Sequence, residues 1–437
     1  MGQVYLAHLR SPVFGPPFTH PSLNNEREGT IIRAHHIGAT SPKEDPDHYV
    51  LAATNLMEQY RTLLATNPQC PLIINYPGWI FGLGLEVATY LIQSLGLSDV
   101  VYMSEKGPAE VVEPLSQAAS LARVPLTILP SQPTEFVSRS SAQIRSMQMQ
   151  SYFHMAQPAG ANHPTWLENP VSKNRPFRVR YAGENRGVHG IMTLDSQIMP
   201  DLLCESLEGA LVGVVAIESP NALPTSSSNV PPVNEEEATS NGDDDDVDTE
   251  NETEDNRNAM ISHLTTLTIS TKESLPYITS GPGTSTPLHP SSSSMLGLAL
   301  IRSINPDTQT LDLVTPIPST RLIQSLEQGH ALVLVRGVLD NPNWAVAEEY
   351  YAARAEERRV RRGIRRRKEA GADEQGDERE EQRLLGLLKE RIRRAKDVPF
   401  MTVVEDHGRR KQEEAAQRAL WKLRKKAGIE SEDEVEY

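Results

Sequence analysis

The sequence lacks several features that identify particular classes of protein. It has two cysteines in 437 residues, Cys70 and Cys204, which lie far apart and without a paired spacing. This argues for a reducing compartment and against a disulfide scaffold or a zinc ribbon. No apolar run approaches the length of a membrane-spanning helix, and the N-terminus shows no signal-peptide pattern. We therefore expect no membrane partner.

Nucleotide and metal motifs are also missing. No Gly-Lys dipeptide occurs, so the phosphate loop G-x-x-x-x-G-K-[ST] is absent. Gly82 and Gly84 begin a dinucleotide fingerprint, but Val87 occupies the position of its third glycine. These glycines instead favour a close approach of a helix to a strand. No Ser/His/Asp or Cys/His set stands out, and the pair His35–His36 has no third ligand nearby, so we predict no metal site.

Charge is distributed very unevenly. The formal net charge is −15, and 38% of the residues are hydrophobic, which is low for a fully folded chain. Residues 243–246 form a compact acidic block, whereas residues 354–368 hold nine basic and two acidic side chains. That basic run is a solvated helix face, a localisation signal or a nucleic-acid-binding arm. Its arginine density favours nucleic acid or nuclear import.

The first 155 residues alternate strand and helix patterns. Short apolar runs predict strands at 1–10, 30–37, 72–74, 100–103 and 125–129, and helical spacing predicts helices at 47–64, 85–95 and 109–122. Such alternation predicts right-handed crossovers and a parallel sheet. The strand at 72–74 ends in the turn Asn75-Tyr-Pro-Gly78, which then lies at the edge of the sheet where ligands bind.

Two kinds of side chain near this sheet could bind a nucleic acid or a nucleotide. Trp79 is either a core anchor or an aromatic on which a base stacks. Arg139 and Arg145 lie in a polar, helical stretch, where they either clamp phosphates or are solvated.

The second half of the chain changes character. Runs at 188–194, 210–217, 296–304, 311–315 and 331–339, without intervening helices, predict a small β-domain of sandwich or barrel type. A Ser/Pro/Asn/Thr-rich acidic insertion at 219–290 interrupts it and is predicted to be disordered. Charged helices follow, to about 395 and at 409–426, and the last eight residues form an acidic tail.

Four segments together resemble one known family: GQVYLAHLRSPVFGPPFTHP, IRAHHIGATSPKEDPDHY, CPLIINYPGWIFGLGLEVATYL and RSSAQIRSMQMQSYFH. They are similar to the polynucleotide 5′-hydroxyl kinases of RNA processing, above all to the fungal nucleolar branch that acts on ribosomal RNA precursors with an endonuclease partner. The combination of Gly-x-x-Ser-Pro with Asn-x-x-Gly-Trp is specific. The resemblance continues through the β-domain in LGLALIRSI, LVTPIP, ALVLVRG and DNPNW.

The resemblance implies transfer of the γ-phosphoryl group of ATP to a 5′-hydroxyl of RNA, with Mg²⁺ as cofactor. By the same resemblance, Arg139 and Arg145 are catalytic residues in a lid over the phosphates. The nucleotide and substrate path is formed by Gly38, Thr40, Ser41, Asn75, Gly78 and Trp79. Pre-rRNA and an rRNA-processing endonuclease are the implied partners, and the nucleus and nucleolus the implied location.

In this family the phosphate loop precedes the GQVYLAHL strand, so the chain resembles the distal part of such a kinase. The expected fold class is α/β: a partial parallel-sheet P-loop-type kinase domain without its first strands, then a small all-β domain and a charged helical tail. The expected domains are 1–157, with an arginine lid at 138–154, then 158–345 and 346–437.

Three functions remain open. The chain is a polynucleotide kinase that is inactive on its own, a non-catalytic scaffold that binds the endonuclease and pre-rRNA, or an RNA-binding subunit. Phosphate transfer to a 5′-hydroxyl RNA separates the first from the others, and a strong dependence of binding on salt would mark the third.

Overall fold

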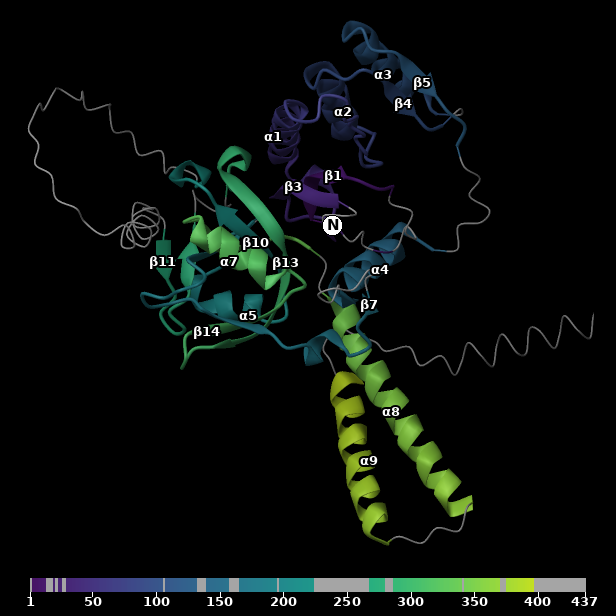
Figure 1. Ribbon diagram of the computed structural model, residues 1–437, viewed down its shortest axis with the longest axis vertical. Coiled ribbons are helices and arrows are strands. Elements are labelled where there is room, and N and C mark those ends of the chain that lie inside the picture. The colour runs from purple at the N-terminus through teal and green to yellow at the C-terminus, as the bar shows by residue number, and fades with distance from the viewer. Residues whose placement is uncertain are drawn as a thin grey trace, which may run out of the picture. The chain divides into compact units, whose positions relative to one another are not determined.

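A computed structural model (Figure 1) describes residues 2–12, 19, 23–25, 29–104, 107–131, 139–156, 165–194, 196–223, 267–279, 286–339, 342–369 and 375–396. Contacts divide the chain into two compact units, Met1–Ala345 and Val346–Tyr437. The acidic block at 243–246, the predicted helix at 409–426 and the acidic tail lie outside the described residues.

The chain begins with a small antiparallel sheet. Its strand order is β1 (Gln3–Leu9), β3 (Gly29–His36) and β2 (Asn24–Asn25), and both neighbouring pairs run antiparallel. The predicted strands at 1–10 and 30–37 are confirmed, but the parallel arrangement is wrong for them. A parallel pair needs a crossover connection, usually a helix, whereas the described part of the link between these strands includes a short strand that folds back on β3.

An α/β segment follows. It comprises α1 (Pro46–Leu64), α2 (Leu83–Ser94), β4 (Val100–Tyr102), α3 (Ala109–Leu121) and β5 (Leu126–Ile128). β4 and β5 pair in parallel, and α3 connects them (Figure 1). The three predicted helices and these two strands are confirmed, so the expected parallel arrangement holds for β4 and β5.

Residues 72–74 do not form the predicted strand. Within the described residues no strand pairs with them, and without such a partner their main-chain groups cannot enter a ladder. Leu72 packs against the α1–α2 core, whereas Ile73 is 90% exposed and Ile74 is 48% exposed. The segment therefore has the apolar composition of a strand but joins no sheet in the described part of the chain.

Next, α4 (Ser141–His154) precedes a two-stranded ribbon of β6 (Met155–Ala156) and β7 (Thr165–Trp166). The helix packs onto the sheet domain that follows it. Met149 and Phe153 enter the core of that domain, and the Tyr152 hydroxyl donates to the carbonyl oxygen of Leu298 at 3.2 Å.

The sheet domain has eight strands in the order β11-β12-β9-β15-β10-β13-β14-β8. Their bounds are β8 (Phe177–Arg180), β9 (Gly190–Thr193), β10 (Leu211–Ile217), β11 (Leu267–Ile269), β12 (Pro276–Ile278), β13 (Ser293–Asn305), β14 (Thr310–Val314) and β15 (Ala331–Arg336). β9 pairs in parallel with β12 and β15, and the other pairs are antiparallel. All seven residues of β10 are buried, because apolar clusters cover both faces of the sheet.

Two features of this domain differ from the prediction. The helices α5 (Leu203–Leu207) and α7 (Ser319–Glu327) lie between strands that were expected to follow one another without helices. β11 and β12 lie inside the range 219–290 that was predicted to be disordered. Tyr277 and Ile278 of β12 are fully buried. Their order depends on packing against the rest of the sheet domain, which the composition of the range 219–290 does not indicate.

The second unit contains most of α8 (Asn343–Glu369) and α9 (Gln375–Lys396). Short 3-10 helices occur elsewhere, at Pro42–Glu44, Val171–Lys173, Pro200–Leu202, Pro220–Ala222 and Pro290–Ser292. Among the helices described, none is both long and apolar enough to cross a bilayer.

Candidate functional site

The loop that follows β3 carries three of the predicted path residues. Gly38 has a φ of 72°, and its main-chain nitrogen donates to the carbonyl oxygen of Gly2 at 3.2 Å. Thr40 is exposed, whereas the Ser41 hydroxyl accepts a bond from the Lys43 nitrogen at 3.4 Å and caps a 3-10 helix. Thr40 thus has a free approach from solvent, while Ser41 also has a structural task.

Gly337, just after β15, holds this loop against the sheet domain. A Cβ atom at Gly337 would collide with the main chain of Gly38, and one at Gly38 would lie 2.6 Å from Leu194 Cδ1. The two backbones therefore touch only because both residues lack a side chain.

Replacing Gly337 with alanine is expected to destabilise the first unit by about 2 kcal/mol, since a methyl group must push two packed backbones apart. Urea unfolding monitored by tryptophan fluorescence measures this loss. Gly78→Ala is the control, because a Cβ there meets nothing within 4 Å, and we expect a change within about 0.5 kcal/mol. Equal stability of the two variants would contradict the proposed contact.

The turn after residues 72–74 carries the other path residues. Asn75 and Gly78 are exposed, and Trp79 is half-buried against the core between α1 and α2. Gly84 lies under the indole: a Cβ at Gly84 would be 2.7 Å from Trp79 Cδ2. The predicted close approach is thereby confirmed for Gly84, although its partner is a turn and not a strand. Trp79 serves as a core anchor, and a further role in binding stays a prediction.

The two predicted lid arginines lie around the start of α4. Ser140 caps this helix in a capping box: the Gln143 nitrogen donates to Ser140 Oγ at 3.3 Å, and the Ser140 nitrogen donates to Gln143 Oε1 at 2.9 Å. Arg139 precedes the cap and is exposed. Arg145 is half-buried, and its Nε atom is buried without a hydrogen-bond partner.

The predicted path and lid residues pack on different elements of the first unit. Trp79 packs against α1 and α2, whereas the C-terminal half of α4 packs on the sheet domain. Their shared role therefore stays a prediction.

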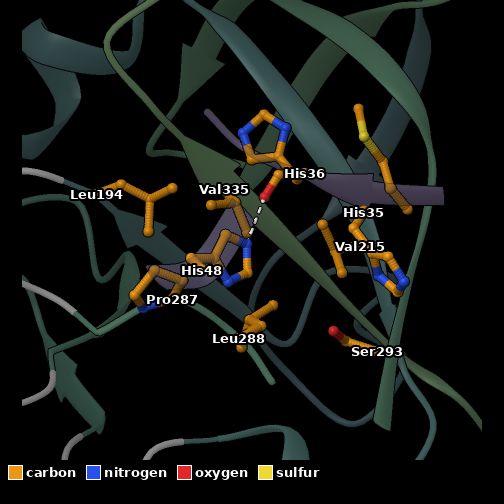
Figure 2. A pocket seen from close by; sticks show the side chains of 10 residues that line it. His35, His36, His48, Leu194, Val215, Pro287, Leu288, Ser293 and Val335 are labelled. Atoms are coloured by element: carbon orange, nitrogen blue, oxygen red, sulfur yellow. Dashed lines mark hydrogen bonds between the residues drawn. The ribbon is translucent and has the colours of Figure 1, made fainter. Parts of the chain in front are cut away.

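The sequence singles out the pair His35–His36 but not the third histidine that joins it in a buried cluster. His35 and His36 of β3 meet His48 of α1 around a small cavity (Figure 2). Its volume is about 10 Å³, which is the space of about one water molecule. His48 lies on the first turn of α1, where Asp45 caps the helix by accepting a bond from the His48 nitrogen at 3.0 Å. In the sequence, the only indication of the position of His48 is Asp45, a residue type that caps helices, because it places His48 on the first turn of α1.

Few hydrogen bonds satisfy the three rings. His48 Nε2 lies 3.0 Å from the carbonyl oxygen of His36 (Figure 2), and His35 Nε2 lies 3.0 Å from Asn55 Oδ1. Both ring nitrogens of His36 are buried without a partner. In the described part of the chain, no group of three or more His, Cys, Asp or Glu side chains is arranged to hold a metal ion.

The environment keeps all three histidines neutral. Burial, followed by the charge of Arg33, lowers the pKa of His35 to about 4. Burial, followed by repulsion from His48, lowers the pKa of His36 to about 3. Burial also lowers the pKa of His48, against the opposing effect of its bond to the His36 carbonyl. The cluster thus suits a neutral, closely packed junction and not a general acid or base near pH 7.

Comparison with known proteins connects these residues with a family. Residues 14–155 match the family model described as mRNA cleavage and polyadenylation factor CLP1 P-loop. The chain is 94% identical over 437 residues to the polynucleotide 5′-hydroxyl-kinase grc3 of Emericella nidulans, covering 100% of this chain and 53% of that protein.

Other curated relatives carry the same name. The protein of Aspergillus clavatus is 59% identical over 459 residues, covering 100% of this chain and 55% of the relative. That of Gibberella zeae is 34% identical over 358 residues, covering 80% of this chain and 44% of the relative. The chain spans about half the length of these relatives. The resemblance to the Grc3 group of polynucleotide 5′-hydroxyl kinases is thereby confirmed for the part that this chain covers.

Proposed function

We propose, on the premise that this chain corresponds to about half of a Grc3-type polynucleotide 5′-hydroxyl kinase, that it takes part in transfer of the γ-phosphoryl group of ATP to the 5′-hydroxyl of RNA. The observation that carries the proposal is the 94% identity over all 437 residues to the Emericella nidulans protein of that name. Pre-rRNA is the proposed substrate, an rRNA-processing endonuclease the proposed partner, and the nucleolus the proposed location.

The described residues do not fit an ATP–Mg²⁺ complex by themselves. The chain has no Gly-Lys dipeptide, and its described residues hold no cluster of three or more His, Cys, Asp or Glu side chains that could bind a metal ion. A P-loop kinase cradles phosphates in its loop and holds Mg²⁺ with loop and acidic residues. We therefore assign the phosphate loop to the half of the relatives that this chain does not cover.

Arg139 and Arg145 are the proposed contribution of this chain to charge stabilisation. Guanidinium groups match phosphoryl oxygens in charge and geometry. The buried Nε of Arg145 lacks a protein partner, so this side chain has hydrogen-bonding capacity to spare. Asn75, Gly78 and Trp79, together with Gly38, Thr40 and Ser41, are the proposed lining of the path for nucleotide and RNA.

An uncovered face of the α/β segment supports the proposed incomplete kinase domain. Val100, Tyr102 and Leu126 pack against α2 and α3 on one side of the β4–β5 pair. On β4, β5 and the residues that directly follow them, the following apolar side chains are exposed: Val101 (54%), Met103 (64%), Ile128 (46%) and Leu129 (40%). Parallel sheets are normally covered on both faces. We propose that the phosphate-loop unit covers these residues.

A reconstitution experiment tests the function. The 437-residue chain is assayed for ATP-dependent phosphate transfer to a 5′-hydroxyl RNA. It is assayed alone and after expression together with the part of the Emericella nidulans relative to which this chain does not align. We expect no transfer by the chain alone and transfer by the combination. Strong transfer by the chain alone contradicts the need for a missing loop, and a stable but inactive combination contradicts the kinase function.

The same assay tests the lid. In the active combination, Arg145→Gln is expected to lower the rate of transfer by roughly 10³-fold, because a guanidinium that neutralises the transferring phosphoryl group contributes effects of this order. Arg10→Gln, at an exposed position of the N-terminal region, is the control and is expected to keep the parent rate. Equal rates of transfer by the two variants would contradict a catalytic role for Arg145.

A scaffold function is the second candidate, favoured by the separate contact unit at 346–437. In that case the chain binds the endonuclease without catalysing transfer. A pull-down of the endonuclease with residues 348–437 deleted addresses this function. Binding that persists without the deleted residues argues against a contact through this unit.

A further inference from the structure

The α8–α9 unit presents a row of arginines on one side of a helix. Arg358, Arg362 and Arg366 are exposed and stand four residues apart, so they lie on one face of α8 and rise by about 6 Å per step. Together with residues of α9 they line a surface hollow of about 760 Å³. Figure 1 shows α8 and α9 as neighbouring antiparallel helices.

The base of the hairpin is firmly packed, which keeps this face in place. Tyr350 and Ala353 of α8 form a core with Ile392 of α9. Glu357, only 4% exposed, accepts bonds from Arg354 at 3.1 Å and from Arg361 at 2.7 Å. These two arginines are thus bound to a structural carboxylate, which balances one of their two positive charges within the helix.

The three arginines of the row are not balanced in this way. Within the described residues, no hydrogen bond or ion pair joins Arg358, Arg362 or Arg366 to a partner, and only Glu356 and Glu381 bring negative charge to the hollow. Glu356 lies 3.7 Å from Arg359, whose positive charge it offsets. The hollow therefore keeps an excess of positive charge in a chain whose formal net charge is −15.

We propose that the hollow between α8 and α9 binds the phosphate backbone of single-stranded RNA, with Arg358, Arg362 and Arg366 contacting successive phosphates. The site lies outside the proposed kinase domain, and the idea that its ligand is RNA rests on the proposed function. Its lining has no aromatic side chain on which a base could stack, so it binds RNA without regard to sequence and holds the substrate strand.

The test measures RNA binding and not phosphate transfer. The whole 437-residue chain is titrated with a fluorescent single-stranded RNA at several salt concentrations, using RNAs with a 5′-hydroxyl and with a 5′-phosphate. The variant R358Q/R362Q/R366Q removes the row, and glutamine retains a good helix propensity. The matched control R391Q/R393Q/R394Q removes three positive charges from exposed positions of α9 that do not line the hollow.

We expect the row variant to bind roughly 100-fold more weakly at about 0.1 M salt and to show a salt slope smaller by about 2, since each phosphate contact on a single strand contributes about 0.7. The control is expected to stay within a few-fold of the parent, and both RNAs should behave alike. Circular dichroism verifies that both variants retain their helices.

Three results would overturn the proposal: unchanged binding by the row variant, equal weakening by both variants, or binding of a glutamate-rich peptide in place of RNA, which would identify a protein ligand. Because the readout is independent of the 5′ end and of ATP, its failure leaves the kinase proposal standing. If the combination of both halves is inactive as a kinase but still binds RNA through the row, the kinase proposal fails and the RNA-binding proposal stands.

Discussion

Acidification from pH 6.5 to pH 5 is expected to cost the first unit about 2 kcal/mol for each of the buried histidines His35 and His36. Their pKa values lie at about 4 and about 3 in the folded protein, against 6.5 in the unfolded chain. Between these limits the unfolded state binds protons that the folded state does not, so stability is complete above pH 6.5 and falls as the pH drops toward 4.

Two neighbours of the cluster lower the histidine pKa values further, and one acidic neighbour raises the pKa of His48. Arg33 faces His35, and His289 faces His48, so added protons meet like charge, while Asp45 opposes this effect at His48. Urea unfolding at a series of pH values measures the slope. His36→Leu removes a ring whose two nitrogens lack partners, and we expect an unchanged or higher stability at pH 7 and a shallower loss in acid. Parallel pH curves for variant and parent would contradict this account.

Removing the Arg33 side chain is expected to destabilise the same unit by about 3 kcal/mol. Arg33 Nη1 donates to both carboxylate oxygens of Glu218, at 2.7 and 2.9 Å. Its Nη2 donates to the carbonyl oxygens of Pro290 and Ser293, both at 3.0 Å. The arginine thus joins β3 to two segments of the sheet domain. Arg33→Met leaves a partly buried carboxylate and two carbonyl groups without their partner.

Urea unfolding of Arg33→Met, Glu218→Gln and the double variant measures the coupling between the two side chains. We expect a coupling of 1–2 kcal/mol, roughly, because Glu218 is still 27% exposed and water screens part of the pair. Lys43→Met is the control: Lys43 and Glu44 are 3.3 Å apart but 60% and 51% exposed, so the loss should stay below about 0.5 kcal/mol. A coupling near zero would show that Arg33 acts only through its carbonyl contacts.

Much of the secondary structure followed from local pattern. α1, α2 and α3 were predicted within a few residues, because their apolar stripes repeat at helical spacing and recognisable residues mark their ends. β10, β13, β14 and β15 were likewise visible as short apolar runs. The segments that resemble the kinases also carried their signal in the sequence alone.

Partnerships between distant segments could not be predicted in the same way. Whether residues 72–74 form a strand depends on a neighbouring strand, and the pairing of β1 with β3 depends on the path of the link between them. β11 and β12 lie in a polar region whose own composition predicts disorder, yet they complete the sheet beside β9. His48 meets His36 only after α1 folds back on β3.

The sequence by itself determined the helices, most strands of the sheet domain, the lack of a phosphate loop and the resemblance to polynucleotide kinases, because each of these depends on residue types at short, regular spacing. Only the tertiary structure decided which strands pair, where Trp79 packs, which histidines share a cavity and which arginines of α8 keep an unbalanced charge. These outcomes depend on contacts such as that between Arg33 and Glu218, which lie 185 positions apart. No local pattern encodes the partner of such a contact, because folding selects it from the whole chain.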